Sequence, residues 1–258
     1  MTASPLAPEA PELSVVIPAF NEEKRLGRTL LEVDEYCRSR RLAAEIVVVN
    51  DGSSDGTGPL ARAFAARQPV RVLDNPGNRG KGYSVRHGMQ AARGREILFT
   101  DADLSAPISE VEKLRAALAQ DADIAIGSRA RRELIRARQG RFRELSGRLF
   151  NWLVVAMLGL RFKDTQCGFK LFRREAAEAI LPLQRVEGWG FDPEMLYLAR
   201  RRGLRVVEVP VLWSHAEGAK IHLLRDGARM FLDVLRIRWN ALRGRYSEKA
   251  PPRSASAA

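Results

Sequence analysis

Cysteine is scarce in this chain of 258 residues, where only Cys37 and Cys167 occur. They lie far apart and form no CxxC pair, which favours a reduced, cytosolic protein. Neither cysteine has a histidine pattern nearby that would partner it, so a catalytic thiol is disfavoured.

Long apolar runs are absent too: no stretch reaches eighteen residues, and no transmembrane helix is expected. The longest candidate, residues 149–160, would form roughly 18 Å of helix, against an apolar bilayer core of about 30 Å. Residues 1–12 have neither the basic nor the apolar region of a secretory signal. We expect them to form a disordered leader, and residues 246–258 a disordered tail.

The net charge of +12 is concentrated in two segments. Residues 129–148 hold eight Arg against two Glu, and residues 220–253 hold nine basic side chains against three acidic ones, so each segment contributes +6. Such clusters suit an anionic partner, which means nucleic acid, a phosphorylated substrate or anionic lipid. Solvated arginine-rich faces are the alternative interpretation.

Apolar strand-like runs alternate with helix-like stretches through the first half of the chain. The predicted strands span residues 13–19, 45–51, 70–75, 95–103 and 123–129. The predicted helices span residues 22–40, 55–67, 82–92 and 108–119. Near-continuous apolar strands separated by helices indicate an α/β fold with a parallel sheet covered on both faces.

Polar residues follow all five predicted strands at their carboxyl ends, where open α/β sheets bind ligands. They are Pro18 to Glu22, Asp51, Asn75 and Asn78, Asp101 and Asp103, and Ser128 and Arg129. Because five consecutive strands share this feature, we expect a binding site at this edge of the sheet.

Two carboxylates stand one residue apart after the fourth strand, in the triplet Asp101-Ala102-Asp103. Their mutual repulsion calls for a cation, and hard oxygen ligands suit Mg²⁺ or Mn²⁺. An ion held there would bridge a diphosphate and neutralise a departing nucleoside diphosphate. A solvated turn is the alternative, and the polar groups at the other strand ends argue against it.

Two turn-rich blocks also follow strands. Asp51 begins the first, residues 51–57, and is placed to accept hydrogen bonds from a base or ribose, although a plain strand–turn–helix connection explains the glycine and serines beside it. The second, residues 75–82, lacks the GK[ST] of a P-loop. Its glycines allow the backbone to approach a ligand closely, and Lys81 is placed to meet a phosphate.

Residues 139–160 join a basic stretch to an apolar one, and residues 221–246 repeat this composition. Amphipathic helices at a membrane interface have this character, with Arg near headgroups and Trp or Leu at the acyl boundary. A helix buried in the protein core is the alternative.

The ordered motifs resemble those of glycosyltransferase family 2 over residues 13–245. They are residues 15–23, 47–57, 78–89, 99–107 and 126–129. Further motifs resemble the branch that glucosylates dolichyl phosphate. These are residues 164–174, 188–196 and 217–220.

This resemblance implies a GT-A-type fold, a three-layer α/β/α sandwich with a mostly parallel central sheet. It implies one glycosyltransferase domain over residues 13–245, with a nucleotide-sugar-binding half (13–129) and an acceptor- and membrane-facing half (130–245).

The motifs also imply roles for single residues. The residues expected to bind the nucleotide sugar are Pro18, Phe20, Glu22, Val49, Asp51, Lys81, Asp101, Ala102, Asp103 and Lys220. The metal ligands would be Asp101 and Asp103, and the acceptor phosphate would meet Arg129, Arg143 and Arg148. The expected catalytic residues are Asp103, Asp192 and Arg129. Two positions depart from related mannosyltransferases, since Ser105 stands where they often carry Gln and Ser214 where they carry Arg.

A phosphate acceptor simplifies the expected mechanism. A phosphate monoester has a second pKa of about 6 and is already anionic near neutrality, so it needs positioning more than a general base. Single displacement would invert the anomeric carbon. Asp192, where many family members keep a base, would instead orient the sugar or acceptor, unless it is only an acid at a helix N-terminus.

We therefore expect transfer of glucose from UDP-glucose to a polyprenyl phosphate on the cytosolic face of a membrane, with an anionic membrane surface as partner and no nucleic acid. Two alternatives keep the enzyme class: GDP-mannose as the donor, or a soluble molecule as the acceptor. A non-catalytic module that binds membranes or nucleic acid is the alternative from another class, and nothing in anion binding requires the acidic triplet.

Overall fold

Strands and helices alternate through the first half of the chain, each within three residues of its predicted bounds. The computed structural model describes residues 10–137, 151–214 and 223–247. The first elements are β1 (Leu13–Ala19), α1 (Glu23–Ser39), β2 (Ala44–Asn50), α2 (Thr57–Ala65), β3 (Val70–Asp74), α3 (Lys81–Ala91), β4 (Glu96–Thr100), the short 3₁₀ helix η1 (Ile108–Glu110), α4 (Val111–Ala119) and β5 (Ile124–Ser128).

The second half supplies two more strands of the sheet and the helices that cover it. Its elements are η2 (Arg132–Leu134), β6 (Ile135–Ala137), a helix over residues 151–158, β7 (Phe169–Arg173), α6 (Arg174–Ile180), η3 (Leu181–Leu183), α7 (Phe191–Arg201), β8 (Val206–Pro210), β9 (Trp213–Ser214) and α8 (Leu223–Leu242). Strands β6 and β9 pair with each other outside the main sheet.

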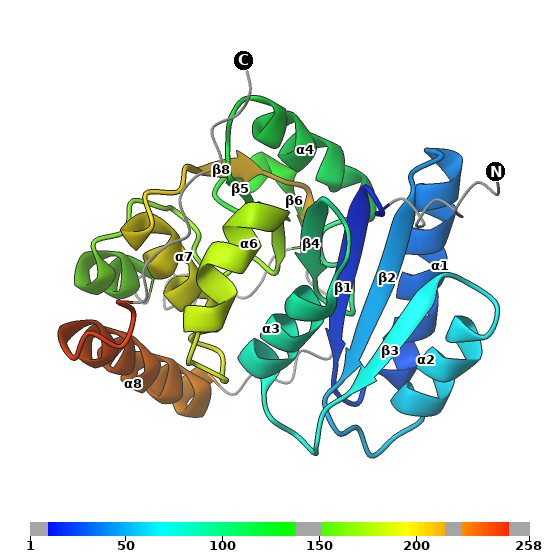
Figure 1. The fold of residues 1–258 in the computed structure, drawn as a ribbon, viewed down its shortest axis with the longest axis horizontal. Coiled ribbons are helices and arrows are strands. Elements are labelled where there is room, and N and C mark those ends of the chain that lie inside the picture. Colours follow the sequence, from blue (N-terminus) through cyan, green and yellow to red (C-terminus); the bar gives the residue numbers. More distant parts are fainter. Residues whose placement is uncertain (1–9, 138–150, 215–222, 248–258) are drawn as a thin grey trace, which may run out of the picture.

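The main sheet has seven strands in the order β3-β2-β1-β4-β7-β5-β8 (Figure 1). Its strands pair in parallel except β7, which runs antiparallel between β4 and β5. The predicted mostly parallel sheet is therefore confirmed. The apolar pattern does not predict β7, because Lys170 and Arg173 interrupt it in this five-residue segment.

Helices cover both faces of the sheet, which confirms the three-layer sandwich (Figure 1). On β1, Val15 and Ile17 join the core beneath α1, α2 and α4, whereas Val16 joins the core beneath α3, α6 and α7. Alternate side chains of a strand point to opposite faces, so a strand buried on both sides is apolar at nearly every position. This explains why the strands read as continuous apolar runs.

The antiparallel direction of β7 brings a distant segment to the predicted binding edge. Thr100 at the end of β4 pairs with Phe169 at the start of β7, so residues 164–168 enter the sheet at the carboxyl end of β4. The backbone N–H of Asp101 donates to the carbonyl of Gly168 at 3.2 Å. The motif at 164–174 and the acidic triplet are therefore neighbours in space.

The two apolar–basic segments lie only partly within the described residues. In the helix over residues 151–158, Val154 and Leu158 are buried, whereas Trp152 is 63% exposed. In α8, Val234 and Ile237 are buried. Each helix therefore packs one side on the protein and leaves apolar side chains exposed on the other, and contact of those side chains with a membrane stays a prediction.

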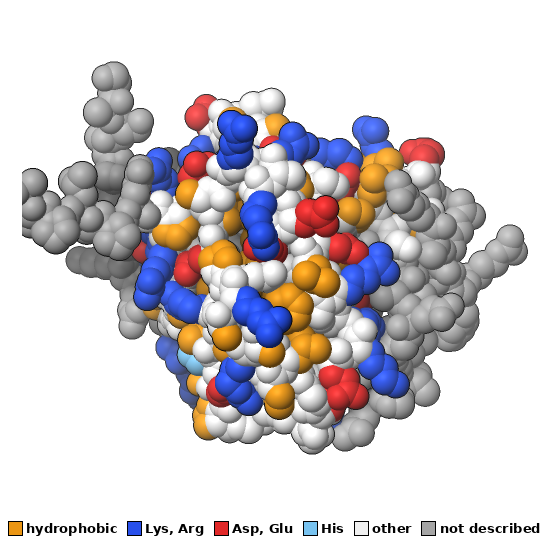
Figure 2. All heavy atoms as spheres, turned by 90° about the vertical axis from the view of Figure 1, so that its right-hand side faces the viewer, with side chains coloured by type: hydrophobic (Ala, Val, Ile, Leu, Met, Phe, Trp, Pro, Cys, Tyr) orange, Lys and Arg blue, Asp and Glu red, His pale blue; other side chains and the backbone are white. Residues whose placement is uncertain are grey.

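The exposed apolar side chains of α8 are large. They are Phe231, Leu232, Leu235, Trp239 and Leu242. None of the helices in the described ranges is long and apolar enough to cross a membrane. On the face of the molecule that carries α1, α2 and β3, Lys and Arg side chains are scattered among acidic and apolar ones (Figure 2).

Candidate active site

The acidic triplet is placed directly after β4, where cations from two other elements meet it. Nζ of Lys81, in the first turn of α3, lies 2.6 Å from Oδ1 of Asp101. NH1 of Arg25, in α1, lies 3.9 Å from Oδ2 of Asp103. Both carboxylates remain accessible, with side chains 31% and 24% exposed. The structure thus places Lys81 beside the triplet, and its contact with a phosphate stays a prediction.

Aromatic rings complete the surroundings of Lys81. Its ammonium lies 5.0 Å from the ring of Trp189 and 5.5 Å from that of Phe99. Burial by itself lowers the pKa of Lys81, but Asp101 and Asp192 outweigh it, and the net pKa is raised. The lysine is therefore a fixed positive charge at neutral pH.

Gly168 leaves room for the Asp101 carboxylate. A Cβ at position 168 would stand 2.5 Å from Cγ of Asp101, and closer still to Oδ2. A larger residue at position 168 would therefore displace the Asp101 side chain, because real Cβ atoms do not approach other heavy atoms so closely. Gly168, in the motif at residues 164–174, thus determines the space available to Asp101 of the acidic triplet.

Asp51 is buried and binds the protein's own loop. Its carboxylate accepts hydrogen bonds from Nδ2 of Asn75 at 2.7 Å and from the backbone N–H groups of Arg79 and Gly80, both at 2.9 Å. Three such bonds hold the segment that leads into Lys81. In this structure Asp51 positions the phosphate-side lysine, and its contact with a base or ribose stays a prediction.

The other predicted nucleotide-binding residues differ in their exposure and in their partners. Phe20 is 39% exposed. Glu22 pairs with Arg25 at 2.8 Å, the arginine that also approaches Asp103. Pro18 is buried beside Val49 in the parallel register of β1 and β2.

The side chain of Val49 packs in the core, so it is not free to face a nucleotide. It is fully buried, and a Cβ on Gly88 of α3 would stand 2.7 Å from its Cγ2. Ala102 contributes its backbone, whose carbonyl accepts a hydrogen bond from the hydroxyl of Thr29 at 2.6 Å. Any contact between these two residues and a nucleotide is therefore expected from their backbones.

Arg129 forms a two-pronged ion pair with Asp164. Nε and NH2 of the arginine donate to the two carboxylate oxygens at 2.7 and 2.8 Å, and its backbone N–H donates at 3.0 Å. The guanidinium also lies 5.5 Å from the ring of Trp213. Although burial raises the pKa of Asp164, Arg129 outweighs it and holds that pKa at about 2. The predicted acceptor-phosphate arginine is thus fixed in one orientation.

Asp192, in the first turn of α7, is buried against an unexpected partner. Nζ of Lys170 lies 2.5 Å from its Oδ1 and also donates to the carbonyl of Cys167 at 2.6 Å. Lys170 itself is fully buried in β7. Burial raises the pKa of Asp192, opposed by the charges of Lys170 and Lys81. Asp192 is therefore held by a cation and is not free to act as an unpaired base.

Glu194, two residues on, serves the fold. Its carboxylate accepts hydrogen bonds from the backbone N–H groups of Arg185 and Val186 and from the hydroxyl of Tyr246. Cys37 and Cys167 are both buried, and burial raises the pKa of their thiols to about 11 and about 12. Protonated thiols are poor nucleophiles, so neither is suited to catalysis.

Sequence reasoning did not find Lys170, Asp164 and Gly168 as parts of the site. A lysine within an apolar strand is a detectable signal, because a buried ammonium needs a partner. The other two become meaningful only when β7 is placed beside β4. Three predicted residues, Arg143, Arg148 and Lys220, lie outside the described residues.

The oxygen donors of Asp101 and Asp103 fit a hard divalent cation. Among the residues described, no group of three or more His, Cys, Asp or Glu side chains comes together as a metal site. Mg²⁺ and Mn²⁺ do not need one, since one or two carboxylates often hold Mg²⁺ together with substrate phosphates and water. Both carboxylates are also partly exposed, so their oxygens are accessible to such an ion.

Relatives with established names match most of the chain. It is 41% identical over 241 residues to the dolichyl-phosphate beta-glucosyltransferase of Drosophila melanogaster, covering 88% of this chain and 74% of that protein. It is 38% identical over 251 residues to the Homo sapiens protein of the same name, covering 91% and 77%. The Saccharomyces cerevisiae counterpart is 36% identical over 257 residues, covering 92% and 77%.

Solved structures share the fold. Mannosyl-3-phosphoglycerate synthase from Rubrobacter xylanophilus superposes with a TM-score of 0.68 at 20% identity, covering 96% of this chain and 79% of that one. Glucosyl-3-phosphoglycerate synthase from Mycobacterium tuberculosis, solved with Mn²⁺, UDP-glucose and phosphoglyceric acid, has a TM-score of 0.64 at 20% identity, covering 93% and 81%. The model of the glycosyl transferase family 2 matches residues 14–181. With its acidic triplet after β4, the chain therefore belongs to the glycosyl transferase family 2, and it is a glycosyltransferase.

Proposed function

We propose that this chain transfers glucose from UDP-glucose to the phosphate of a polyprenyl lipid at the cytoplasmic surface of a membrane. The observation that carries the proposal is its 36–41% identity to proteins named dolichyl-phosphate beta-glucosyltransferase, over three quarters of their length. A protein of the same fold was solved with Mn²⁺ and UDP-glucose, which makes these the first metal and donor to test.

Asp101 and Asp103 would hold the divalent ion. When bound, Mg²⁺ or Mn²⁺ would supply Lewis-acid stabilisation of the negative charge that develops on the departing diphosphate. Lys81 would also stabilise the negative charge on the diphosphate, and it needs no metal to do so. Its ammonium lies 2.6 Å from Asp101 and carries a fixed positive charge. Its place between Asp101 and the ring of Trp189 restricts it to the side of the site where the diphosphate would lie.

The acceptor phosphate needs a positioned cation, because it must approach a donor that is itself anionic. Arg129 is suited to this, since Asp164 fixes its guanidinium through two hydrogen bonds. An oxygen of the acceptor phosphate would attack the anomeric carbon as the bond from that carbon to the UDP oxygen breaks. The electron pair leaves with UDP, the configuration inverts, and no proton has to move.

Asp192 has a positioning role in this proposal. A hydroxyl acceptor would need a general base, whereas a phosphate that is already ionised does not. The ion pair with Lys170, at 2.5 Å, ties the Asp192 carboxylate to β7. We expect it to hold the start of α7, and with it Trp189, against Lys81.

A membrane surface would bring the lipid to the site. Trp152 is exposed, and α8 exposes apolar side chains in a segment that also carries Arg229, Arg236 and Arg238, a combination suited to the headgroup and acyl boundary. Arg243 stacks on Trp239, with its guanidinium carbon 4.4 Å from the ring centroid. Flotation with phosphatidylcholine vesicles and with vesicles that also contain phosphatidylserine tests this point at low and high salt. Failure to float with either would favour a soluble acceptor.

The donor is tested with purified protein, Mn²⁺ or Mg²⁺, polyprenyl phosphate, and labelled UDP-glucose or GDP-mannose in parallel. Label from UDP-glucose in the organic phase is the expected result, and Asp103→Asn should abolish it. If label is transferred from GDP-mannose and not from UDP-glucose, the donor is GDP-mannose. If no lipid-linked sugar forms with any donor, the proposal fails.

A further inference from the structure

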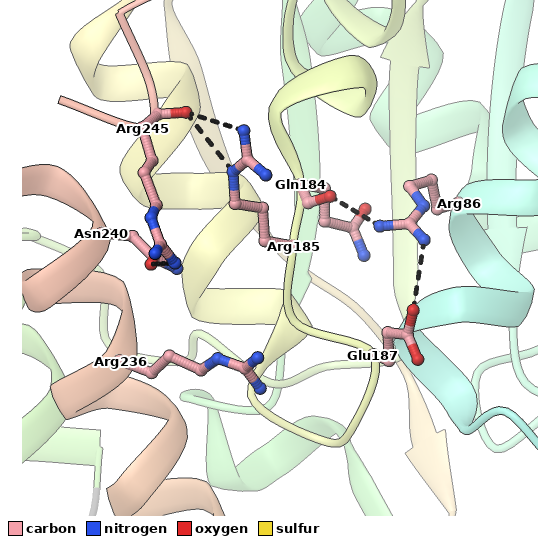
Figure 3. A pocket seen from close by; sticks show the side chains of 7 residues that line it. All are labelled: Arg86, Gln184, Arg185, Glu187, Arg236, Asn240 and Arg245. Carbon is pink, nitrogen blue, oxygen red and sulfur yellow. Dashed lines mark hydrogen bonds and ion pairs between the residues drawn. The ribbon is translucent and has the colours of Figure 1, made fainter. Parts of the chain in front are cut away.

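An arginine-lined pocket of about 280 Å³ lies outside the candidate active site (Figure 3). Its walls come from α3, from the segment between η3 and α7, and from α8 with the turn that follows it. Four arginines line it: Arg86, Arg185, Arg236 and Arg245. Their gathering requires an explanation, since like charges in one cavity repel each other.

The protein itself neutralises little of this charge. Glu187 is the acidic residue of the lining, and Arg79, from outside the pocket, already pairs with it at 3.0 Å, while NH2 of Arg86 lies 3.7 Å from the same oxygen. Arg185 donates to the carbonyl of Arg245 at 3.2 and 3.4 Å, which is a neutral acceptor. The lining therefore retains an excess of positive charge.

Arg236 is the guanidinium most open to a ligand. Among the described residues it has no hydrogen-bond or ion-pair partner within 4 Å. Burial raises the pKa of Asp233, one helical turn away, and the charge of Arg236 offsets that rise only in part. Figure 3 shows its side chain extending from α8 toward the segment that carries Arg185 and Glu187. A guanidinium in this position offers several donors to an anion.

We propose that this pocket binds a phosphate group whose anionic oxygens meet Arg236 and Arg245. Hydrogen phosphate, a free phosphate monoester and the glycerol-phosphate headgroup of a lipid share this chemistry. Guanidinium groups suit phosphate oxygens because they present paired N–H donors in one plane. The pocket is separate from the transfer reaction, since its lining contains none of the residues assigned to the donor or the acceptor phosphate.

The chain offers a matched pair of variants for the test. Arg236→Gln removes a pocket charge, whereas Arg238→Gln removes the same charge from an exposed position of α8 outside the lining. In one arm, inorganic phosphate is titrated into each protein by calorimetry. In the other, each protein is floated with vesicles of phosphatidylcholine alone or mixed with phosphatidylglycerol.

Arg236→Gln should weaken binding about tenfold, the effect of one charge-assisted hydrogen bond, and Arg238→Gln should leave it within about twofold of wild type. A selective effect in the vesicle arm identifies a lipid headgroup as the source, and one confined to the calorimetric arm identifies free phosphate. Equal effects of the two variants in both arms, or no binding by the wild type in either, would overturn the proposal. Thermal unfolding of both variants checks that they remain folded.

Discussion

Gly168 and Asp101 lie in contact although they are 67 positions apart, and a Cβ at position 168 would stand 2.5 Å from the carboxylate carbon of Asp101. The backbone of position 168 cannot simply retreat, because its carbonyl accepts the hydrogen bond from the N–H of Asp101. The side chain of Asp101 must move instead.

Gly168→Ala should therefore lower kcat/KM about 100-fold, as a displacement of about 1 Å in a reacting group does. Gly27→Ala on α1 is the control, since a Cβ there makes ordinary contact at 3.6 Å. Steady-state kinetics of both variants provides the measurement. Full activity of Gly168→Ala would show that the position of Asp101 is not critical.

Lys81→Met should reduce kcat by about 10²-fold to 10³-fold, the usual effect of removing one group that stabilises developing charge. Lys81→Arg keeps the charge but not the compact ammonium beside Trp189, and we expect it to recover part of the rate. Single-turnover kinetics with UDP-glucose separates the chemical step from product release. A change in KM alone would mean that Lys81 binds the donor equally in ground and transition states.

Lys170→Met should destabilise the protein by about 3–5 kcal/mol, because it leaves the Asp192 carboxylate buried without its cation. Removing both charges, as Lys170→Met with Asp192→Leu, should recover most of that loss, since an apolar pair has no desolvation penalty to offset. Urea unfolding followed by circular dichroism measures both. If the single and the double variant lose the same free energy of unfolding, the loss in Lys170→Met does not come from an unpaired buried carboxylate. That result would contradict the ion-pair interpretation.

Acid stability should depend on Asp164. Its pKa is about 2 in the folded protein, below the value of about 3.8 expected in the unfolded chain. A carboxyl group whose pKa is lowered by folding stabilises the protein above the unfolded pKa, and here the contribution is about 2 kcal/mol at neutral pH. It is lost as the pH falls from about 4 to about 2.

Asp164→Asn should therefore flatten the stability profile over that pH range, measured by urea unfolding at each pH. Asp74→Asn is the control, because Asp74 pairs with Arg62 at the surface, where both side chains are more than half exposed and the pair is screened. Parallel profiles of wild type and Asp164→Asn below pH 4 would rule out the proposed contribution.

The sequence was sufficient to predict the order of strands and helices in the first half, because strands buried on both faces are apolar almost throughout. It also placed Asp101 and Asp103 correctly, since an acidic pair that follows such a strand must lie at the carboxyl edge of the sheet. The role of Val49 follows from the family resemblance alone. Its side chain is fully buried, so the expected nucleotide contact would come from its backbone and stays a prediction.

The pairs that hold the site together could not be predicted in the same way. Lys170 meets Asp192, and Asp164 meets Arg129, only because β7 inserts antiparallel between β4 and β5. That insertion depends on long-range pairing, for which a five-residue segment with two charged side chains carries no local signal.

Competition between two acceptors tests the central claim most directly. Wild-type protein receives labelled UDP-glucose and Mn²⁺ with equal concentrations of polyprenyl phosphate and 3-phosphoglycerate, and the label is separated between the organic and aqueous phases. We expect the label to enter the lipid, as a β-linked glucosyl phosphate formed by inversion. Label in the aqueous phosphoglycerate product instead, or an α-linked lipid, would contradict it.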